Sequence, residues 1–197
     1  MSPLLKVSLA ILVVLLGAVF FYQPLKMVVS KGSITNDFLL QAADGPLDSK
    51  RLRGKVLAIE FGYANCGTPC AARMEKFAKA YELLSVAERQ QVKMILVSVD
   101  PEHDTPARIR QYATGIGRDI VGATGTPENI QAVAEAFGAD YKKFDTKDGG
   151  YAIDMRGLTY VVDAEGRFAS VLNEMAPAEQ IAAALRQRVP AAALPPR

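Results

Sequence analysis

This chain of 197 residues has few histidines, few cysteines and a small net charge. These features exclude two classes of protein. Two cysteines and one histidine are too few for the usual zinc site with four Cys/His ligands. The formal net charge is only +2, from 23 basic and 21 acidic side chains, and no stretch interleaves basic with aromatic residues. We therefore expect no nucleic-acid partner.

A long apolar stretch opens the chain. Residues 9–22 are apolar without interruption, and residues 4–22 just reach the roughly 18–20 residues that a membrane-spanning helix needs. A cleaved signal peptide would end in small residues, whereas the run GAVFFY at 17–22 is mostly bulky. We therefore expect an uncleaved signal anchor at 1–22 and a linker at 23–33, with a cleaved leader as the alternative.

Charges and thiols indicate the compartment. Lys6 favours a cytoplasmic amino terminus, although Lys26 and Lys31 flank the other side of the apolar stretch. Paired thiols in a soluble domain fit an oxidising compartment, and the short leader suits a bacterial periplasm. We expect a single-pass protein of the bacterial inner membrane whose soluble domain lies in the periplasm.

Strand and helix signals alternate along the rest of the chain. Mostly apolar runs, typical of buried strands, cover residues 55–61 and 92–99. A hairpin is expected at 158–172 and a last helix at 177–188, before a tail at 190–197 that is too rich in proline and alanine to pack. Threonine can cap a helix and proline suits its first position, which predicts three helix starts: Thr68–Pro69, Thr105–Pro106 and Thr126–Pro127.

This succession predicts a thioredoxin-like α/β domain over residues 34–189. Ligands of open α/β sheets bind beyond the carboxyl ends of the strands. The loop after the first buried strand carries both cysteines, and the loop after the second covers residues 100–106. We therefore expect these two loops to be neighbours.

The two cysteines, Cys66 and Cys70, lie between the first buried strand and the first helix. A turn of this kind directs backbone N–H groups and the positive end of the helix dipole at a thiol, which favours the thiolate. Three intervening residues let both sulfurs reach one point, either each other or one soft ion. Redox chemistry or copper binding is the leading interpretation. An inert disulfide is the alternative, although a bridge across so short a loop constrains little unfolded chain.

Several motifs resemble the SCO/SenC family, membrane-anchored thioredoxin-fold proteins that help to assemble the dinuclear copper centre of cytochrome c oxidase. The family pattern Ser-Val-Asp-Pro-x-x-Asp-Thr-Pro is complete at 98–106, and residues 122–126 match Gly-Leu-Thr-Gly-Thr except at Ala123. The resemblance covers about residues 34–185 and includes the N-terminal anchor. The run FGYANCGTPCAA keeps five residues of the pattern Phe-Gly-Tyr-Thr-x-Cys-Pro-Asp-x-Cys-Pro: Phe61, Gly62, Tyr63, Cys66 and Cys70.

The resemblance implies a copper site at Cys66 and Cys70, with a departure at the third ligand. The family has a histidine in Tyr-x-x-Asp-His-Ser, whereas this chain keeps Tyr151 and Asp154 and has Met155 in the histidine position. Thiolate and thioether ligands select Cu(I), whereas imidazole also supports Cu(II). We therefore expect copper as the cofactor, with Cu(I) preferred.

Residues near this position leave alternatives open. Met155 could instead be a flexible side chain that fills core space. His103, the one histidine, could supply the missing ligand from its own loop or be a solvated loop residue. Asp100 and Asp104 could form an acid pair, or Asp104 could cap the next helix while Asp100 orders the loop. Residues 145–150 form a turn that could act as a lid or merely as a connection.

The resemblance implies a metallochaperone whose partner is the copper-bearing subunit of cytochrome c oxidase or another periplasmic copper or thiol protein. It would pass Cu(I) to that partner or keep its cysteines reduced. The alternative is a dedicated thiol–disulfide oxidoreductase without metal, and a redox or copper sensor is a third interpretation. A broad reductase would use Cys-x-x-Cys and a cis-proline, but this chain has one residue more between its thiols and no proline between Asp145 and Leu158. The peroxidatic pattern Pro-x-x-x-Thr-x-x-Cys is also absent.

Overall fold

The computed structural model describes residues 36–147 and 149–190, which belong to one compact unit formed by residues 34–197. Among the described residues there is no helix long and apolar enough to cross a membrane. Three expected segments lie outside the described residues, apart from Pro190: the anchor 1–22, the linker 23–33 and the tail 190–197.

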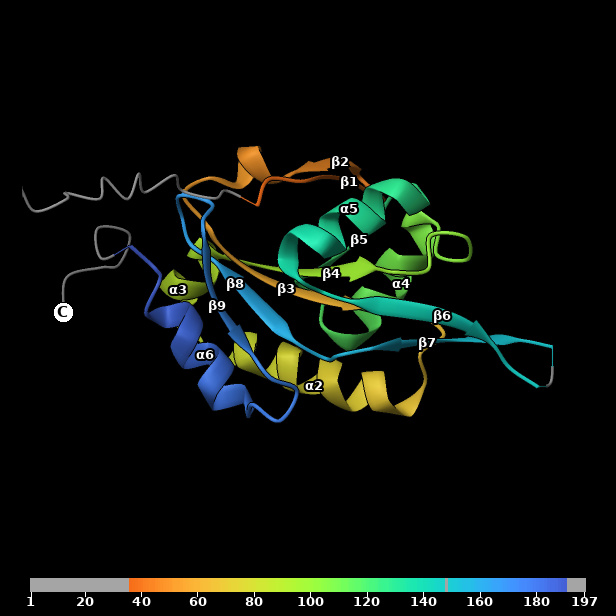
Figure 1. Ribbon diagram of the computed structural model, residues 1–197. Helices are drawn as coiled ribbons and strands as arrows, with labels where there is room; N and C mark the ends of the chain where they lie inside the picture. The colour runs from red at the N-terminus through yellow and green to blue at the C-terminus, as the bar shows by residue number, and fades with distance from the viewer. Residues whose placement is uncertain (1–35, 148, 191–197) are drawn as a thin grey trace, which may run out of the picture. The chain divides into compact units, whose positions relative to one another are not determined.

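Seven strands form a mixed sheet in the order β2-β1-β5-β4-β3-β8-β9 (Figure 1). The three central strands β5, β4 and β3 run parallel, and the outer strands pair antiparallel. The strands of this sheet are β1 (Leu39–Ala42), β2 (Gly45–Asp48), β3 (Val56–Gly62), β4 (Val92–Ser98), β5 (Ile120–Thr124), β8 (Thr159–Val162) and β9 (Phe168–Leu172).

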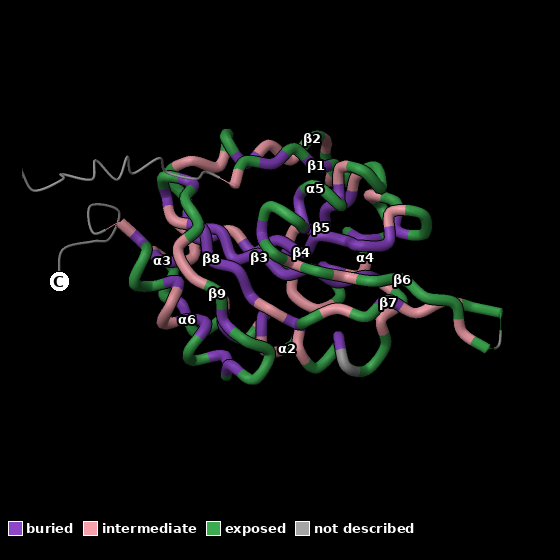
Figure 2. Tube along the Cα trace, in the orientation of Figure 1, coloured by how far each residue is buried: buried purple, intermediate pink, exposed green. Residues whose placement is uncertain are grey.

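Helices cover both faces of this sheet. The first apolar cluster contains residues of α2, α4 and α6 on one face, and the second contains residues of α5 on the other. Because both faces are covered, β3 is buried along its whole length, as Figure 2 shows. The helices are α2 (Thr68–Glu82), α3 (Val86–Gln91), α4 (Pro106–Ile116), α5 (Pro127–Phe137) and α6 (Ala178–Arg186), with a 3-10 turn η1 (Ser49–Leu52) before β3.

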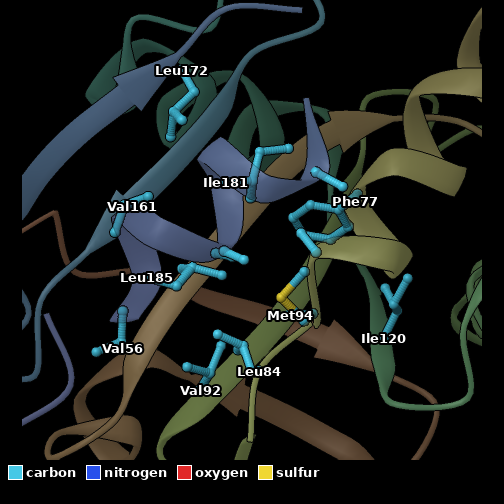
Figure 3. Packing of buried hydrophobic residues seen from close by; sticks show 14 of the residues in the cluster. Val56, Phe77, Leu84, Val92, Met94, Ile120, Val161, Leu172, Ile181 and Leu185 are labelled. Atoms are coloured by element: carbon cyan, nitrogen blue, oxygen red, sulfur yellow. The ribbon is translucent and has the colours of Figure 1, made fainter. Parts of the chain in front are cut away.

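Side chains alternate between the two clusters along β3. Val56 and Ala58 belong to the first cluster, where Phe77 of α2 is completely buried (Figure 3). Leu57 and Ile59 belong to the second cluster. This period of two places the next inward residue on the first face, Glu60, toward the helices that cover that face.

The expected strands and helices are present, together with elements that the sequence did not predict: β2, β5, η1, α3 and a second sheet. Thr105 and Thr126 cap α4 and α5 through their side chains, as predicted. The helix α3 was missed, although Ser85 and Glu88 form a capping box at its start.

A second, two-stranded sheet was also missed. It pairs β6 (Tyr141–Asp145) with β7 (Tyr151–Met155) in antiparallel register, and the expected turn at 145–150 connects the two strands. Four of the five residues of β6 are exposed, so the strand lacks the apolar alternation that marks a strand in sequence. In Figure 1 this hairpin extends away from the main sheet.

Candidate functional site

The two cysteines form a disulfide at the carboxyl end of β3, with their Cα atoms 5.7 Å apart. Cys66 is partly exposed, whereas Cys70, in the first turn of α2, is only 2% exposed. The loop turns into the helix through Gly67, whose φ of +77° suits glycine. The predicted cap at Thr68 was wrong, because Gly67 takes the capping position and Thr68 is already helical.

The loop after β4 holds the cysteine loop in place, so the expectation that the two loops are neighbours is confirmed. The backbone N–H of Ala64 donates to Asp104 Oδ2 at 2.9 Å, and the Ser98 hydroxyl donates to the same oxygen at 2.6 Å. Arg108 donates to Asn65 Oδ1 at 2.7 Å. Asp104 therefore anchors the cysteine loop, and the cap of α4 is supplied by the neighbouring threonine instead.

The hairpin is tied to the same loop through Tyr151. Its hydroxyl donates to buried Asp100, and its ring stacks on His103 with the ring centroids 4.9 Å apart. His103 Nδ1 lies 3.0 Å from Asp100 Oδ1 and 2.8 Å from the Tyr151 oxygen. Burial, followed by the hydrogen bond to Asp100, raises the pKa of Tyr151 well above its usual range. The tyrosine therefore remains a neutral donor that joins the hairpin to the loop.

A lysine forms ion pairs with the carboxylates of this cluster. The oxygens and ring nitrogen of Asp100, Glu102 and His103 lie within 4.8 Å of one another. Lys143 of β6 pairs with Glu102, lies 3.9 Å from Asp100 Oδ1, and sits over the ring of Tyr151 at 4.1 Å from its centroid. The Lys143 ammonium group supplies the positive charge beside these carboxylates. The cluster therefore joins the hairpin to the loop through ion pairs and a cation–π contact.

Met155 lies at the end of β7, opposite Tyr141 in the strand register. It is partly buried and packs against the second apolar cluster, as Cys66 also does. The thioether and one cysteine therefore border the same apolar cluster, although they are 89 positions apart in sequence. Asp154 is exposed and pairs with Lys142 in the strand register.

A buried ion pair lies beside Cys70, and the sequence did not predict it. Arg73 donates from Nε to Glu60 Oε2 at 3.0 Å, and from Nη2 to the Phe61 carbonyl at 3.0 Å. The same Nη2 lies 3.7 Å from Cys70 Sγ. Thr159, opposite Glu60 in the β3–β8 register, donates to the other carboxyl oxygen at 2.6 Å.

Glu60 is fully buried, and this burial changes its pKa. Burial raises the pKa of Glu60 above its ordinary value of 4.5, and the positive charge of Arg73 acts in the opposite direction. A sequence signal for this pair existed, because a carboxylate within the apolar run VLAIEFG needs a buried partner. The sequence did not show which basic residue that partner is.

Known proteins share this architecture. The SCO1/SenC family model matches residues 28–190 of the chain. "Protein SCO1 homolog 1, mitochondrial" of Arabidopsis thaliana is 30% identical over 139 residues, which cover 70% of this chain and 42% of that protein. This chain thus spans less than half of that relative's length.

Two solved structures have the same fold. The structure of Bradyrhizobium japonicum ScoI with copper bound is 33% identical with a TM-score of 0.68, and the match covers 77% of this chain and 97% of that one. The copper-bound ScoI of Arabidopsis thaliana is 25% identical with a TM-score of 0.70, covering 79% and 98%. The expected thioredoxin-like α/β fold is confirmed. Because the family model matches well over half of its length, the chain belongs to the SCO1/SenC family.

Proposed function

We propose that this protein carries Cu(I) between the reduced sulfurs of Cys66 and Cys70, with the Met155 thioether as a third donor. It passes this cargo to the copper-bearing subunit of cytochrome c oxidase, or prepares the thiols of that subunit. Membership of a copper-protein family supports the proposal, as do the copper-bound structures of its relatives. The residues at 1–22 tether the chain to the bacterial inner membrane, with this domain in the periplasm.

One observation carries the proposal: the two sulfur atoms meet at one partly exposed point at the start of α2. Reduction of the disulfide leaves two thiols at that point, near the positive end of the helix dipole, which favours their thiolate forms. Two thiolates and a thioether form a soft donor set, which fits Cu(I) better than Cu(II) or zinc. An apolar cluster borders both Cys66 and Met155, which limits the access of water to the donors.

Metal analysis of the reduced full-length chain tests this function. We expect one equivalent of Cu(I) per chain to be retained in competition with a Cu(I) chelator, and no retention by the Cys66→Ser and Cys70→Ser variants. A matched control is Ser85→Ala, a substitution at the start of α3 and outside the site. Retention of copper by both cysteine variants, or none by the wild type, would overturn the proposal.

The second candidate is a dedicated thiol–disulfide oxidoreductase. The disulfide between Cys66 and Cys70 favours this candidate, because it shows that the two sulfurs can bond without movement of the backbone. The Cu(I) titration, combined with the rate of exchange between this disulfide and glutathione, separates the two candidates. Fast exchange without retained copper supports the oxidoreductase, and tight copper binding with slow exchange supports the metal carrier.

A further inference from the structure

A positive charge faces the disulfide from the interior of the protein. Arg73 lies one helical turn after Cys70 on α2, and its Nη2 is 3.7 Å from Cys70 Sγ. The Arg73 side chain is only 12% exposed, so water screens its charge weakly. The guanidinium is therefore placed to interact with any negative charge that develops on this sulfur.

The position of the guanidinium is fixed by contacts other than the sulfur. Glu60 and the Phe61 carbonyl each accept a hydrogen bond of 3.0 Å from it. Thr159 in turn holds Glu60 through the second carboxyl oxygen. Because these partners belong to β3 and β8, the charge is held by the sheet and does not depend on the state of the disulfide.

A glycine leaves the space that the arginine side chain fills. A Cβ atom at Gly157 would lie 2.5 Å from Arg73 Cδ and Nη1. An alanine at this position would therefore displace the guanidinium without removing its charge. Gly157 follows Met155 by two residues, so the arginine also contacts the segment that leaves the hairpin.

We propose that Arg73 is a positioning residue that stabilises the negative charge on the Cys70 sulfur whenever the disulfide opens, and that Glu60 limits how much of this charge is available. The proposal deepens the function proposed above and rests on it, because it concerns the same cysteine pair. It also gives the two cysteines different roles, since the Arg73 guanidinium lies beside the sulfur of Cys70.

The step restores the dithiol of this chain, and its co-reactant is a thiolate of a reductant protein that is distinct from the copper-bearing subunit. This thiolate attacks the sulfur of Cys66, which is the more exposed of the two cysteines, and forms a mixed disulfide with it. The Cys66–Cys70 bond breaks, and Cys70 leaves with the electron pair as a thiolate beside Arg73. A second thiol of the reductant then displaces Cys66, so the reductant gains a disulfide and this chain gains two electrons and ends as a dithiol. A better-stabilised leaving thiolate departs faster and makes the disulfide easier to reduce.

The experiment measures the equilibrium constant between the disulfide of the copper-free, full-length chain and glutathione. Four variants are compared with the wild type: Arg73→Met, Arg73→Lys, Glu60→Gln and Gly157→Ala. The matched control is Lys79→Met, which removes an exposed charge from the same helix. Folding of each variant is checked by circular dichroism.

The two members of the ion pair are expected to shift this constant in opposite directions. Arg73→Met disfavours reduction about tenfold, which corresponds to about 30 mV for a two-electron couple. Glu60→Gln favours reduction several-fold, because the glutamine still accepts the Arg73 hydrogen bond but removes the competing negative charge. The equilibrium constants of Arg73→Lys and Lys79→Met remain close to that of the wild type. Gly157→Ala disfavours reduction, as Arg73→Met does.

If the pair had only a structural role, Arg73→Met and Glu60→Gln would shift the equilibrium constant in the same direction or leave it unchanged. Either result overturns the proposal. If Arg73→Met does not fold, the opposite shifts of Glu60→Gln and Gly157→Ala decide the question. A wild type that retains Cu(I), with variants whose exchange constants are indistinguishable from its own, overturns only the role of Arg73. A wild type that retains no Cu(I) overturns the proposed function, whatever the variants show.

Discussion

Sulfur is the donor atom at all three positions that we propose to hold copper. Two of these residues are fixed by their positions at the start of a helix, whereas Met155 reaches the region from a hairpin strand. A methionine side chain is flexible, so its contribution depends on whether the hairpin keeps it against the apolar cluster. The metal preference of the proposed site therefore depends on Met155, its proposed third ligand.

Substitution of Met155 tests this dependence. We expect Met155→Ala to weaken Cu(I) binding about tenfold, which is about 1.4 kcal/mol, because a soft donor is lost. Met155→His should instead raise the affinity for Cu(II), because imidazole supports that ion. Competitive titrations with both ions measure these changes. The control is Met175→Ala, whose side chain is 80% exposed. An unchanged Cu(I) affinity in Met155→Ala would remove the residue from the site.

At the residue scale, the sequence indicated the pair of cysteines but not the groups around them. Cys66 and Cys70 are marked by their spacing and by the strand and helix on either side. The contact between Arg73 and Glu60 joins positions 13 apart, and its geometry depends on how α2 packs on β3. Local spacing cannot show this packing.

At the scale of elements, close packing between a strand and a helix fixes the position of α4, where the second loop of the site ends. A Cβ atom at Gly122 in β5 would lie 2.6 Å from the carbonyl carbon of Ile109 in α4. The helix can therefore approach the strand only because this residue is glycine. The start of α4 is also where Asp104 and Arg108 hold the cysteine loop.

Two glycine substitutions should consequently have opposite effects on stability. Gly122→Ala should lower the free energy of unfolding by about 1–3 kcal/mol, because backbone atoms of α4 must move. Gly115→Ala, near the end of the same helix, should raise it by up to about 1 kcal/mol, because nothing lies within 4 Å of the added atom and alanine favours helix. Urea unfolding of the full-length chain measures both. A stable Gly122→Ala variant would show that the contact is not tight in solution.

The element boundaries that the sequence predicted best are those with local chemical signals. Threonine caps and buried apolar runs depend on neighbouring residues, and the structure has α4, α5, β3 and β4 where these signals indicated. The hairpin β6–β7 lacks an apolar pattern and is held through the contacts of Tyr151 and Lys143 with a distant loop. Such contacts leave no periodic signal in the sequence.

At the scale of the whole molecule, the buried ion pair makes stability depend on pH. Because the pKa of Glu60 is raised in the folded state, the folded chain holds its proton to a higher pH than the unfolded chain does. This contribution to stability is complete below the unfolded value of 4.5, and it is lost as the pH rises through the folded pKa.

Replacement of the pair by neutral residues should remove this dependence. Relative to the double variant Glu60→Gln/Arg73→Met, the wild type should lose free energy of unfolding as the pH rises from 4.5 toward neutrality. Each unit of difference between the folded and unfolded pKa corresponds to about 1.4 kcal/mol. Denaturant unfolding of both proteins at a series of pH values gives the difference. Parallel curves for the two proteins would show that Glu60 has the same pKa in both states.

The sequence by itself determined the family, the strands and helices that carry local signals, and the two sulfurs at the turn from β3 to α2, because each depends on residues close together in the chain. Only the tertiary structure decided which groups face those sulfurs: Arg73 at Cys70, and the apolar cluster that borders Cys66 and Met155. The physical reason is that electrostatic and apolar contacts act through space. The packing of helix and hairpin against the sheet therefore determines the environment in which the thiols react.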